Sequence, residues 1–206
     1  YVDAVAVSEG EVTFHNICSK LVADETIDDV ESLVINKDQK CKRNPKRSRM
    51  QLGELPSPYL SKVFDQIIQD NPDVTWSATL ETNRGCPYSC TFCDWGGLTA
   101  SKITQFGINK VKAEIDWFIK NKISFITVAD ANFGIFKARD VEIAESLAKI
   151  KQVDPSFHGV TISFLKNKTD AIIETAKILG DVLVNGVSLS VQTLDPHALT
   201  HIKRSN

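Results

Sequence analysis

The chain has 206 residues, a net charge of −2 and 42% hydrophobic residues, which suits one globular domain, or one domain and part of another. These values exclude a largely disordered chain and a strong overall attraction to nucleic acid or anionic membranes. No apolar run approaches the ~18 residues that a membrane-spanning helix needs, and the first residues lack the pattern of a secretory signal. Three of the five cysteines fall within eight residues, which favours metal-binding thiolates in a reducing compartment, the cytoplasm, over a secreted disulfide scaffold.

The first third of the chain predicts the edge of an α/β unit and then a basic connection. Residues 2–7 and 30–35 are β-prone, and residues 14–22 between them have apolar side chains at helical spacing. Residues 37–49 then place seven basic residues in thirteen positions. No aromatic side chain interleaves them for stacking on bases, so we interpret this segment as a solvated linker or loop rather than a phosphate or nucleic-acid patch. Residues 60–68 predict another helix with one apolar face.

From residue 74 onward, β-prone runs alternate with runs of helical period. The predicted strands are residues 74–81, 123–129, 159–165 and 184–191. The predicted helices are residues 107–121, 139–151 and 170–179, and a last helix that begins after Asp195-Pro196, an N-cap followed by proline. Strands that alternate with helices of this length predict βαβ crossovers and a parallel sheet, which either a barrel or a doubly wound sheet satisfies.

The most informative segment is residues 81–93, a loop expected directly after the first of these strands. Its cysteines, Cys86, Cys90 and Cys93, have the spacing C-x-x-x-C-x-x-C, and Gly85 helps the chain to bend. Three thiolates on one short loop can each bind a different iron of a cubane cluster, which leaves one iron without a protein ligand. An open metal position is where a substrate or cofactor binds, as in catalytic zinc sites.

Two other interpretations of these cysteines compete with an iron–sulfur cluster. A structural zinc site needs a fourth ligand, and no other cysteine or histidine has a spacing that suggests it. Buried free thiols are disfavoured because Arg84, Tyr88 and Thr91 surround the cysteines with polar groups. The zinc interpretation implies a different class of protein, a zinc-stabilised α/β binding module that contacts nucleic acid through residues 37–49.

With Phe92 before the third cysteine, the segment resembles the signature of radical S-adenosylmethionine (SAM) enzymes, C-x-x-x-C-x-aromatic-C. The resemblance covers residues 74–206 and implies a partial (β/α) barrel with a [4Fe-4S] cluster on the loop after its first strand. In that family the open iron binds SAM, and the reduced cluster cleaves it to methionine and a deoxyadenosyl radical. The resemblance also implies a flavodoxin- or ferredoxin-type electron donor and an unknown small-molecule or macromolecular substrate. The apolar run lengths and the charge pattern argue against a membrane or a nucleic-acid partner.

Two of the SAM-binding roles that the resemblance implies fall on or near the second strand and on the cysteine loop. Phe92 is expected to pack near the adenine. Asp130 or Asn132 stands where family members often have Gly-Gly-Glu, which binds the SAM amino group, so this sequence departs from the family pattern there. The alternative role for Asp130 is that of a turn or cap residue.

Further SAM-binding candidates come from later strands. The segment around Gln192 and Arg204 is similar to strand four of coproporphyrinogen-oxidase-like and cobalamin-linked members, where glutamine bonds the ribose and arginine pairs with the carboxylate. The plainer alternatives are a strand-end turn contact for Gln192 and a solvated helix face for Arg204. Ser163, Lys166 and Asn167 follow at the end of the third strand, where they are also expected to line the site.

The N-terminal part resembles the last strand and helix of a cobalamin-binding domain, which precedes the barrel in one subclass. This implies three parts: residues 1–36, a C-terminal remnant of a cobalamin-binding-like domain; residues 37–73, a basic linker and connecting helix; and residues 74–206, the N-terminal part of the barrel. Cobalamin would then be a third cofactor, with methylation of an unactivated carbon or phosphorus centre expected ahead of rearrangement. Because four strands are expected where the family barrel has six, we expect a fragment of a longer enzyme. That this fragment is inactive alone is a third interpretation, beside the radical SAM enzyme and the binding module.

Overall fold

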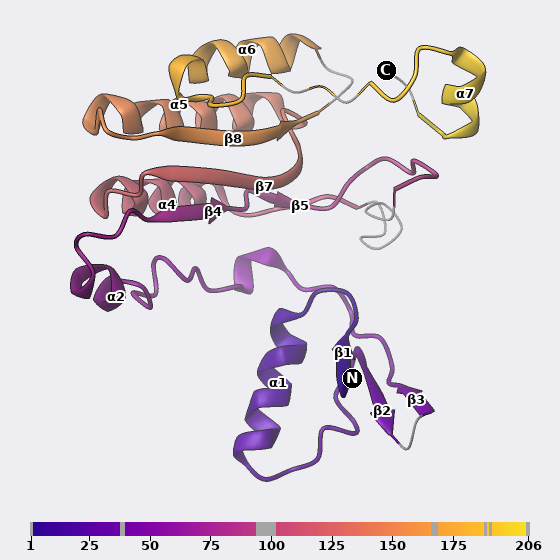
Figure 1. The fold of residues 1–206 in the computed structure, drawn as a ribbon. Helices are drawn as coiled ribbons and strands as arrows, with labels where there is room; N and C mark the ends of the chain where they lie inside the picture. The colour runs from indigo at the N-terminus through magenta and orange to yellow at the C-terminus, as the bar shows by residue number, and fades with distance from the viewer. Residues whose placement is uncertain are drawn as a thin grey trace. The chain divides into compact units, whose positions relative to one another are not determined.

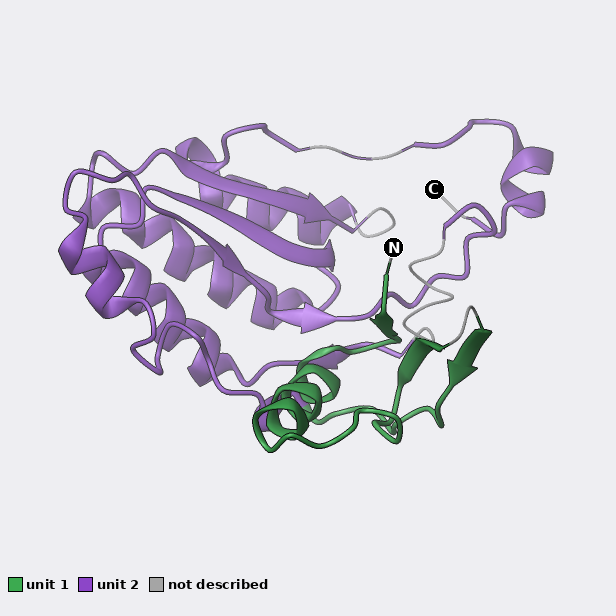
Figure 2. Cartoon of the chain, turned by 60° about the horizontal axis from the view of Figure 1, so that its bottom comes forward, with its two compact units in different colours: residues 1–51 green, residues 52–206 purple. Residues whose placement is uncertain are grey.

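The computed structural model describes residues 2–37, 40–93, 102–165, 169–187, 189 and 191–204. The chain divides into two compact units, residues 1–51 and 52–206 (Figure 2). The basic segment therefore belongs to the first unit. Within the described ranges, no helix combines the length and the apolarity that a bilayer crossing requires.

The first unit consists of a three-stranded antiparallel sheet and one helix. Its strands pair in the order β1 (Ala4–Ala6), β2 (Leu33–Lys37) and β3 (Lys40–Arg43), and α1 spans Glu11–Val22. A small core consists of Val30, Leu33 and Ile35, with Ala4, Ile17 and Ile27 packed against it.

Strand β3 corrects the expectation that residues 37–49 form only a linker or loop. Its four residues pair with β2 in a hairpin, and all four side chains are exposed. Pairing with β2 satisfies the backbone of this segment, and exposed lysines are a usual feature of edge strands because they discourage further pairing. Charge alone therefore does not distinguish an edge strand from a linker.

The second unit is built on a parallel sheet with the strand order β4-β7-β8, as the alternating pattern predicts. Its strands are β4 (Ser77–Leu80), β7 (Phe125–Phe133) and β8 (Gly159–Phe164), with a separate antiparallel pair, β5 (Asn83–Arg84) and β6 (Thr104–Gln105). Its helices are α2 (Asp65–Asp70), α4 (Ile108–Lys120), α5 (Lys137–Val153), α6 (Thr169–Leu179) and α7 (Pro196–His201), with short 3-10 turns at Leu52–Glu54 and Gly180–Val182.

Helices α4, α5 and α6 cover one face of this sheet (Figure 1). The buried strand positions alternate with exposed ones, since successive side chains in a strand point to opposite faces. The buried face holds Ala78, Leu80, Ile126, Val128, Val160, Ile162 and Phe164, which share one core with apolar side chains of the three helices. The other face exposes Thr79, Thr127 and Ser163.

The strand predicted over residues 184–191 is not formed among the residues described there. A single parallel bridge joins Val160 to Leu183, and the N–H of Val184 donates to the carbonyl of Val160 (3.1 Å). Gly186 then adopts a left-handed φ of +60°, and Val184 and Val187 are exposed. The turn at Gly186 takes the chain away from β8, and β-prone residues form a ladder only where neighbouring side chains pack against them.

The helix predicted over residues 60–68 is shorter and begins later. Lys62 has a φ of +64°, a left-handed conformation that cannot continue a right-handed helix, and α2 begins only at Asp65. Val63 and Ile67 of the predicted apolar face are 67% and 49% exposed. The spacing of apolar residues is helical there, but these side chains do not enter the core.

Replacing Gly159 with alanine is expected to lower the free energy of unfolding by about 2–4 kcal/mol. Gly159 has a φ of +137°, and an added Cβ would overlap the carbonyl oxygen of Val182 and lie 2.5 Å from Cγ2 of Val184. Urea unfolding measures the change. Gly53→Ala is the matched control, since its Cβ would meet nothing within 4 Å, and we expect it to stay within about 0.5 kcal/mol of the parent. Equal stability of the two variants would contradict this account of β8.

Candidate cluster and cofactor site

The cysteine segment starts just beyond the C-terminal end of β4 and is closed at its base by β5 and β6. Asn83 pairs with Gln105, and Arg84 pairs with Thr104. Gly85 follows with a φ of +113°, and an added Cβ would lie 2.6 Å from the carbonyl oxygen of Lys102. Only glycine allows the two arms of the loop to come this close.

The three cysteines are free thiols that differ in exposure. Cys86 and Cys90 are partly buried, Cys93 is exposed, and the N–H of Cys93 donates to the carbonyl of Cys90 (3.1 Å). Burial raises the pKa of the Tyr88 phenol, and negative charge on the sulfurs of Cys86 and Cys90 raises it further, whereas the positive charge of Arg204 lowers it. Tyr88 therefore lies within electrostatic range of two of the cysteines and of Arg204.

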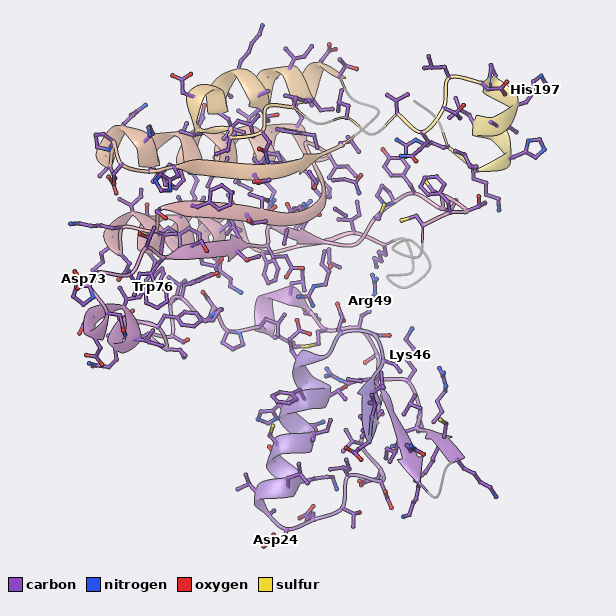
Figure 3. All side chains as sticks on the ribbon, in the orientation of Figure 1. Asp24, Lys46, Arg49, Asp73, Trp76 and His197 are labelled. Atoms are coloured by element: carbon purple, nitrogen blue, oxygen red, sulfur yellow. The ribbon has the colours of Figure 1, made fainter. Side chains whose placement is uncertain are left out.

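The segment after α7 lies against the cysteine loop, since the N–H of Thr91 donates to the carbonyl of Ile202 (3.1 Å). Asp195 caps α7 as predicted, with its Oδ1 accepting from the N–H of Ala198 (2.8 Å). Arg204 follows and is partly buried. His197 points outward from α7 (Figure 3), so this helix brings the residues after it, rather than its histidines, to the loop.

Asp130 is buried in β7 and fastens this strand to the start of the cysteine loop. Its Oδ1 accepts from the backbone N–H groups of Thr82 (2.7 Å) and Asn83 (3.1 Å). Its Oδ2 accepts from Nδ2 of Asn83 (2.7 Å) and from the Thr82 hydroxyl. Arg139 of α5 adds bonds to the carbonyls of Thr82 (2.8 Å) and Phe106 (2.9 Å). The base of the loop is therefore held by β7 and α5 together.

Sequence reasoning missed Thr82, Asn83 and Arg139 as members of this network. The network joins residues 48 and 57 positions apart along the chain, and no local period indicates such pairs. The only available signal was a polar Thr-Asn pair directly after an apolar strand, together with an arginine in the first turn of the next-but-one helix.

Replacing Asp130 with asparagine is expected to destabilise the fold by about 2 kcal/mol above pH 7, because an amide NH₂ would face N–H donors. Burial raises the pKa of Asp130 from 3.8 to about 6. The carboxyl group of Asp130 therefore binds its proton more tightly in the folded parent than in the unfolded chain. As the pH rises from 4 to 6, the free energy of unfolding of the parent therefore falls by up to about 3 kcal/mol, and that of the uncharged variant does not. In urea unfolding, the deficit of the variant should be largest near pH 4 and smallest above pH 6. A deficit that does not change with pH would contradict this role of Asp130.

Asn132, the other predicted residue of β7, lies next to the first cysteine. It is 4% exposed, and its Nδ2 lies 3.3 Å from Sγ of Cys86. Phe92, Ser163 and Gln192 are exposed, and Gln192 lies in a segment with neither helix nor strand. Lys166 and Asn167 lie outside the described residues. Among the predicted residues that the structure describes, beyond the cysteines, Asn132 and Arg204 thus interact with the cysteine loop itself, and Asp130 holds its base.

The described residues do not form a site for a single metal ion. Within them, no three His, Cys, Asp or Glu side chains are close enough together to bind one ion. A zinc site requires ligands at 2.0–2.3 Å from one point. A cubane cluster has no such requirement, because each thiolate binds a different iron.

Comparison with known proteins identifies the family. The sequence profile of the Radical SAM superfamily matches residues 80–206. The chain belongs to the radical SAM superfamily. This confirms the family inferred from the cysteine motif, and it does not support the zinc-stabilised binding module. Members of this superfamily use a [4Fe-4S] cluster and SAM.

Two curated relatives match the whole of this radical SAM chain. It is 36% identical over 211 residues to the cobalamin-dependent radical SAM methyltransferase TokK of Streptomyces tokunonensis. It is also 36% identical over 212 residues to the 2-(S-pantetheinyl)-carbapenam-3-carboxylate methyltransferase of Streptantibioticus cattleyicolor. Each match covers 100% of this chain and 31% of the relative, so the chain spans about a third of their length.

The α/β fold is shared with solved radical SAM structures. The methyltransferase TsrM from Kitasatospora setae, solved with cobalamin and a [4Fe-4S] cluster bound, superposes with a TM-score of 0.68 at 14% identity. The match covers 98% of this chain and 40% of TsrM. At this identity the similarity establishes the fold alone.

Proposed function

We propose that this chain is the cluster- and SAM-binding part of a cobalamin-dependent radical SAM methyltransferase. The observation that carries the proposal is the C-x-x-x-C-x-aromatic-C motif on a loop that begins after β4 and is closed by β5 and β6. Cys86, Cys90 and Cys93 would hold the [4Fe-4S] cluster. When bound, the cluster supplies the electron that cleaves SAM. The two relatives at 36% identity support methyl transfer as the outcome.

For the SAM amino group, the hydrogen bonds in β7 favour Asn132 over Asp130. Each oxygen of Asp130 is already engaged by two donors from the loop base, which leaves it little capacity for a ligand. The Nδ2 of Asn132 faces Cys86, so its Oδ1 remains the acceptor that it can offer. Asp130 then acts on SAM only indirectly, by fixing the loop.

The remaining SAM contacts are assigned by resemblance and by position. Arg204 lies within electrostatic range of the cysteine loop, which suits a guanidinium that pairs with the SAM carboxylate. Phe92 would pack near the adenine, Gln192 would bond the ribose, and Ser163 would line the site from the exposed face of β8.

We further propose that residues 74–206 form the N-terminal part of a (β/α) barrel, whose interior would be lined by the exposed sheet face with Thr79 and Thr127. Residues 1–51, the first unit, would be the C-terminal edge of a cobalamin-binding-like domain, and residues 52–73 would connect it to the barrel. The electron donor would be a flavodoxin- or ferredoxin-type protein of the cytoplasm.

Methyl transfer can be tested with the full-length protein, reconstituted anaerobically with cluster and cobalamin and supplied with a reductant. The first acceptor to test is 2-(S-pantetheinyl)-carbapenam-3-carboxylate, the compound named for one relative. With SAM carrying a trideuterated methyl group, mass spectrometry should find product heavier by one labelled methyl. Cys90→Ala protein is the control and should give none. Formation of 5′-deoxyadenosine from SAM with this acceptor and with related thioethers, without any methylated product, would contradict a methyltransferase.

A further inference from the structure

The contact between Asn132 and Cys86 joins a buried amide to a thiol that is a predicted cluster ligand. The distance from Nδ2 to Sγ is 3.3 Å, within range of an N–H···S hydrogen bond. A thiolate only accepts hydrogen bonds, so the nitrogen of the amide, and not its oxygen, must face it. The chemistry of the pair therefore fixes the orientation of the side chain.

The fold builds this contact from a strand rather than from a surface side chain. Asp130 and Asn132 lie in the part of β7 after Val128, where the register with β8 is irregular, and both side chains are buried. The four hydrogen bonds of Asp130 fix β7 against Thr82 and Asn83, three residues before Cys86. Because Asn132 follows Asp130 in β7 and Cys86 follows Asn83 in the loop, these bonds hold Asn132 and Cys86 close together.

We propose that Asn132 is a positioning residue that sets the reduction potential of the cluster through the Cys86 thiolate. The proposal rests on the proposed function, in which Cys86 is a cluster ligand. A reduced cluster carries one more negative charge than an oxidised one, so a donor to a ligand sulfur stabilises the reduced form more. Asn132 thereby makes the cluster easier to reduce, before any contact with SAM.

The test uses the full-length protein and two variants, Asn132→Leu and the nearly isosteric Asn132→Asp. Anaerobic titration with dithionite and redox mediators, followed by electron paramagnetic resonance, measures the one-electron midpoint potential without SAM. At a fixed applied potential, the ratio of reduced to oxidised cluster in Asn132→Leu should be about tenfold lower than in the parent. For a one-electron couple this corresponds to a midpoint potential lower by about 59 mV. Asn132→Asp should shift at least as far in the same direction, because its carboxylate faces the thiolate.

Asn121→Leu is the matched control, since it removes an asparagine amide bonded to the carbonyl of Trp117 and leaves the cysteine loop untouched. Its midpoint should equal that of the parent. An unchanged midpoint in either Asn132 variant that assembles a full cluster overturns the proposal. If neither assembles one, Asn132→Gln, which keeps an amide donor, decides by its iron content: a parent-like content supports the contact and a loss overturns it. Failure of the parent itself to hold a cluster would instead reject the proposed function.

Discussion

Replacing any one of Cys86, Cys90 and Cys93 with alanine is expected to abolish cluster binding and to lower the rate of SAM cleavage at least about a thousandfold. Each thiolate would hold a separate iron, so the loss of one leaves a second iron without a protein ligand. Iron and sulfide content per chain, together with the yield of 5′-deoxyadenosine, measure the two effects.

The chain contains its own matched controls for this experiment. Cys18 and Cys41 are exposed free thiols in the first unit, outside the motif. Their alanine variants should keep parent-like iron content and activity. If Cys90→Ala kept the iron of the parent while Cys41→Ala lost it, the assignment of the cluster loop would be wrong.

Replacing Gly85 with alanine is expected to prevent stable cluster binding while the parallel sheet still folds. The residue has a φ of +113°, and an added Cβ would lie 2.6 Å from the Lys102 carbonyl, which is backbone and cannot move alone. Relieving the overlap requires the β5–β6 pair to separate, which destabilises the base of the loop by about 2–4 kcal/mol. Iron content after reconstitution and thermal unfolding followed by circular dichroism measure the result.

Gly107→Ala is the control for this second prediction. Gly107 lies just beyond β6 and precedes α4, and nothing lies within 4 Å of an added Cβ. We expect it to bind the cluster as the parent does, with a loss of stability below about 1 kcal/mol. Equal cluster content in Gly85→Ala and Gly107→Ala would show that the close approach at Gly85 does not matter.

The sheet and helices of the second unit were predictable because their burial is periodic. Residues 108–120 and 137–153 repeat apolar side chains at helical spacing, and those side chains form the core. The same signal misleads over residues 60–68, where a left-handed Lys62 interrupts the helix. It also misleads over residues 184–191, where the apolar side chains that the structure describes, Val184, Val187, Leu189 and Val191, are exposed. Apolar spacing predicts an element only when another element covers its apolar face.

The candidate site was predictable where its chemistry is local. The cysteine spacing identifies the loop by itself. Strands β5 and β6 have two residues each and pair across about twenty residues of chain, so the sequence contains no periodic pattern that predicts them. The sequence identified Asp130 and Asn132 together as alternatives for one role. The structure separates them, because Asp130 bonds the loop base and Asn132 faces Cys86, and such long-range pairing has no local signal.

The central claim, that Cys86, Cys90 and Cys93 carry a cluster with one iron open to SAM, is tested most directly by electron paramagnetic resonance. The full-length protein is reconstituted anaerobically with iron and sulfide, reduced with dithionite, and measured with and without SAM. We predict the signal of a reduced [4Fe-4S] cluster that changes when SAM is added. A protein that takes up zinc but no cluster, or a cluster signal that SAM leaves unchanged, would contradict the account.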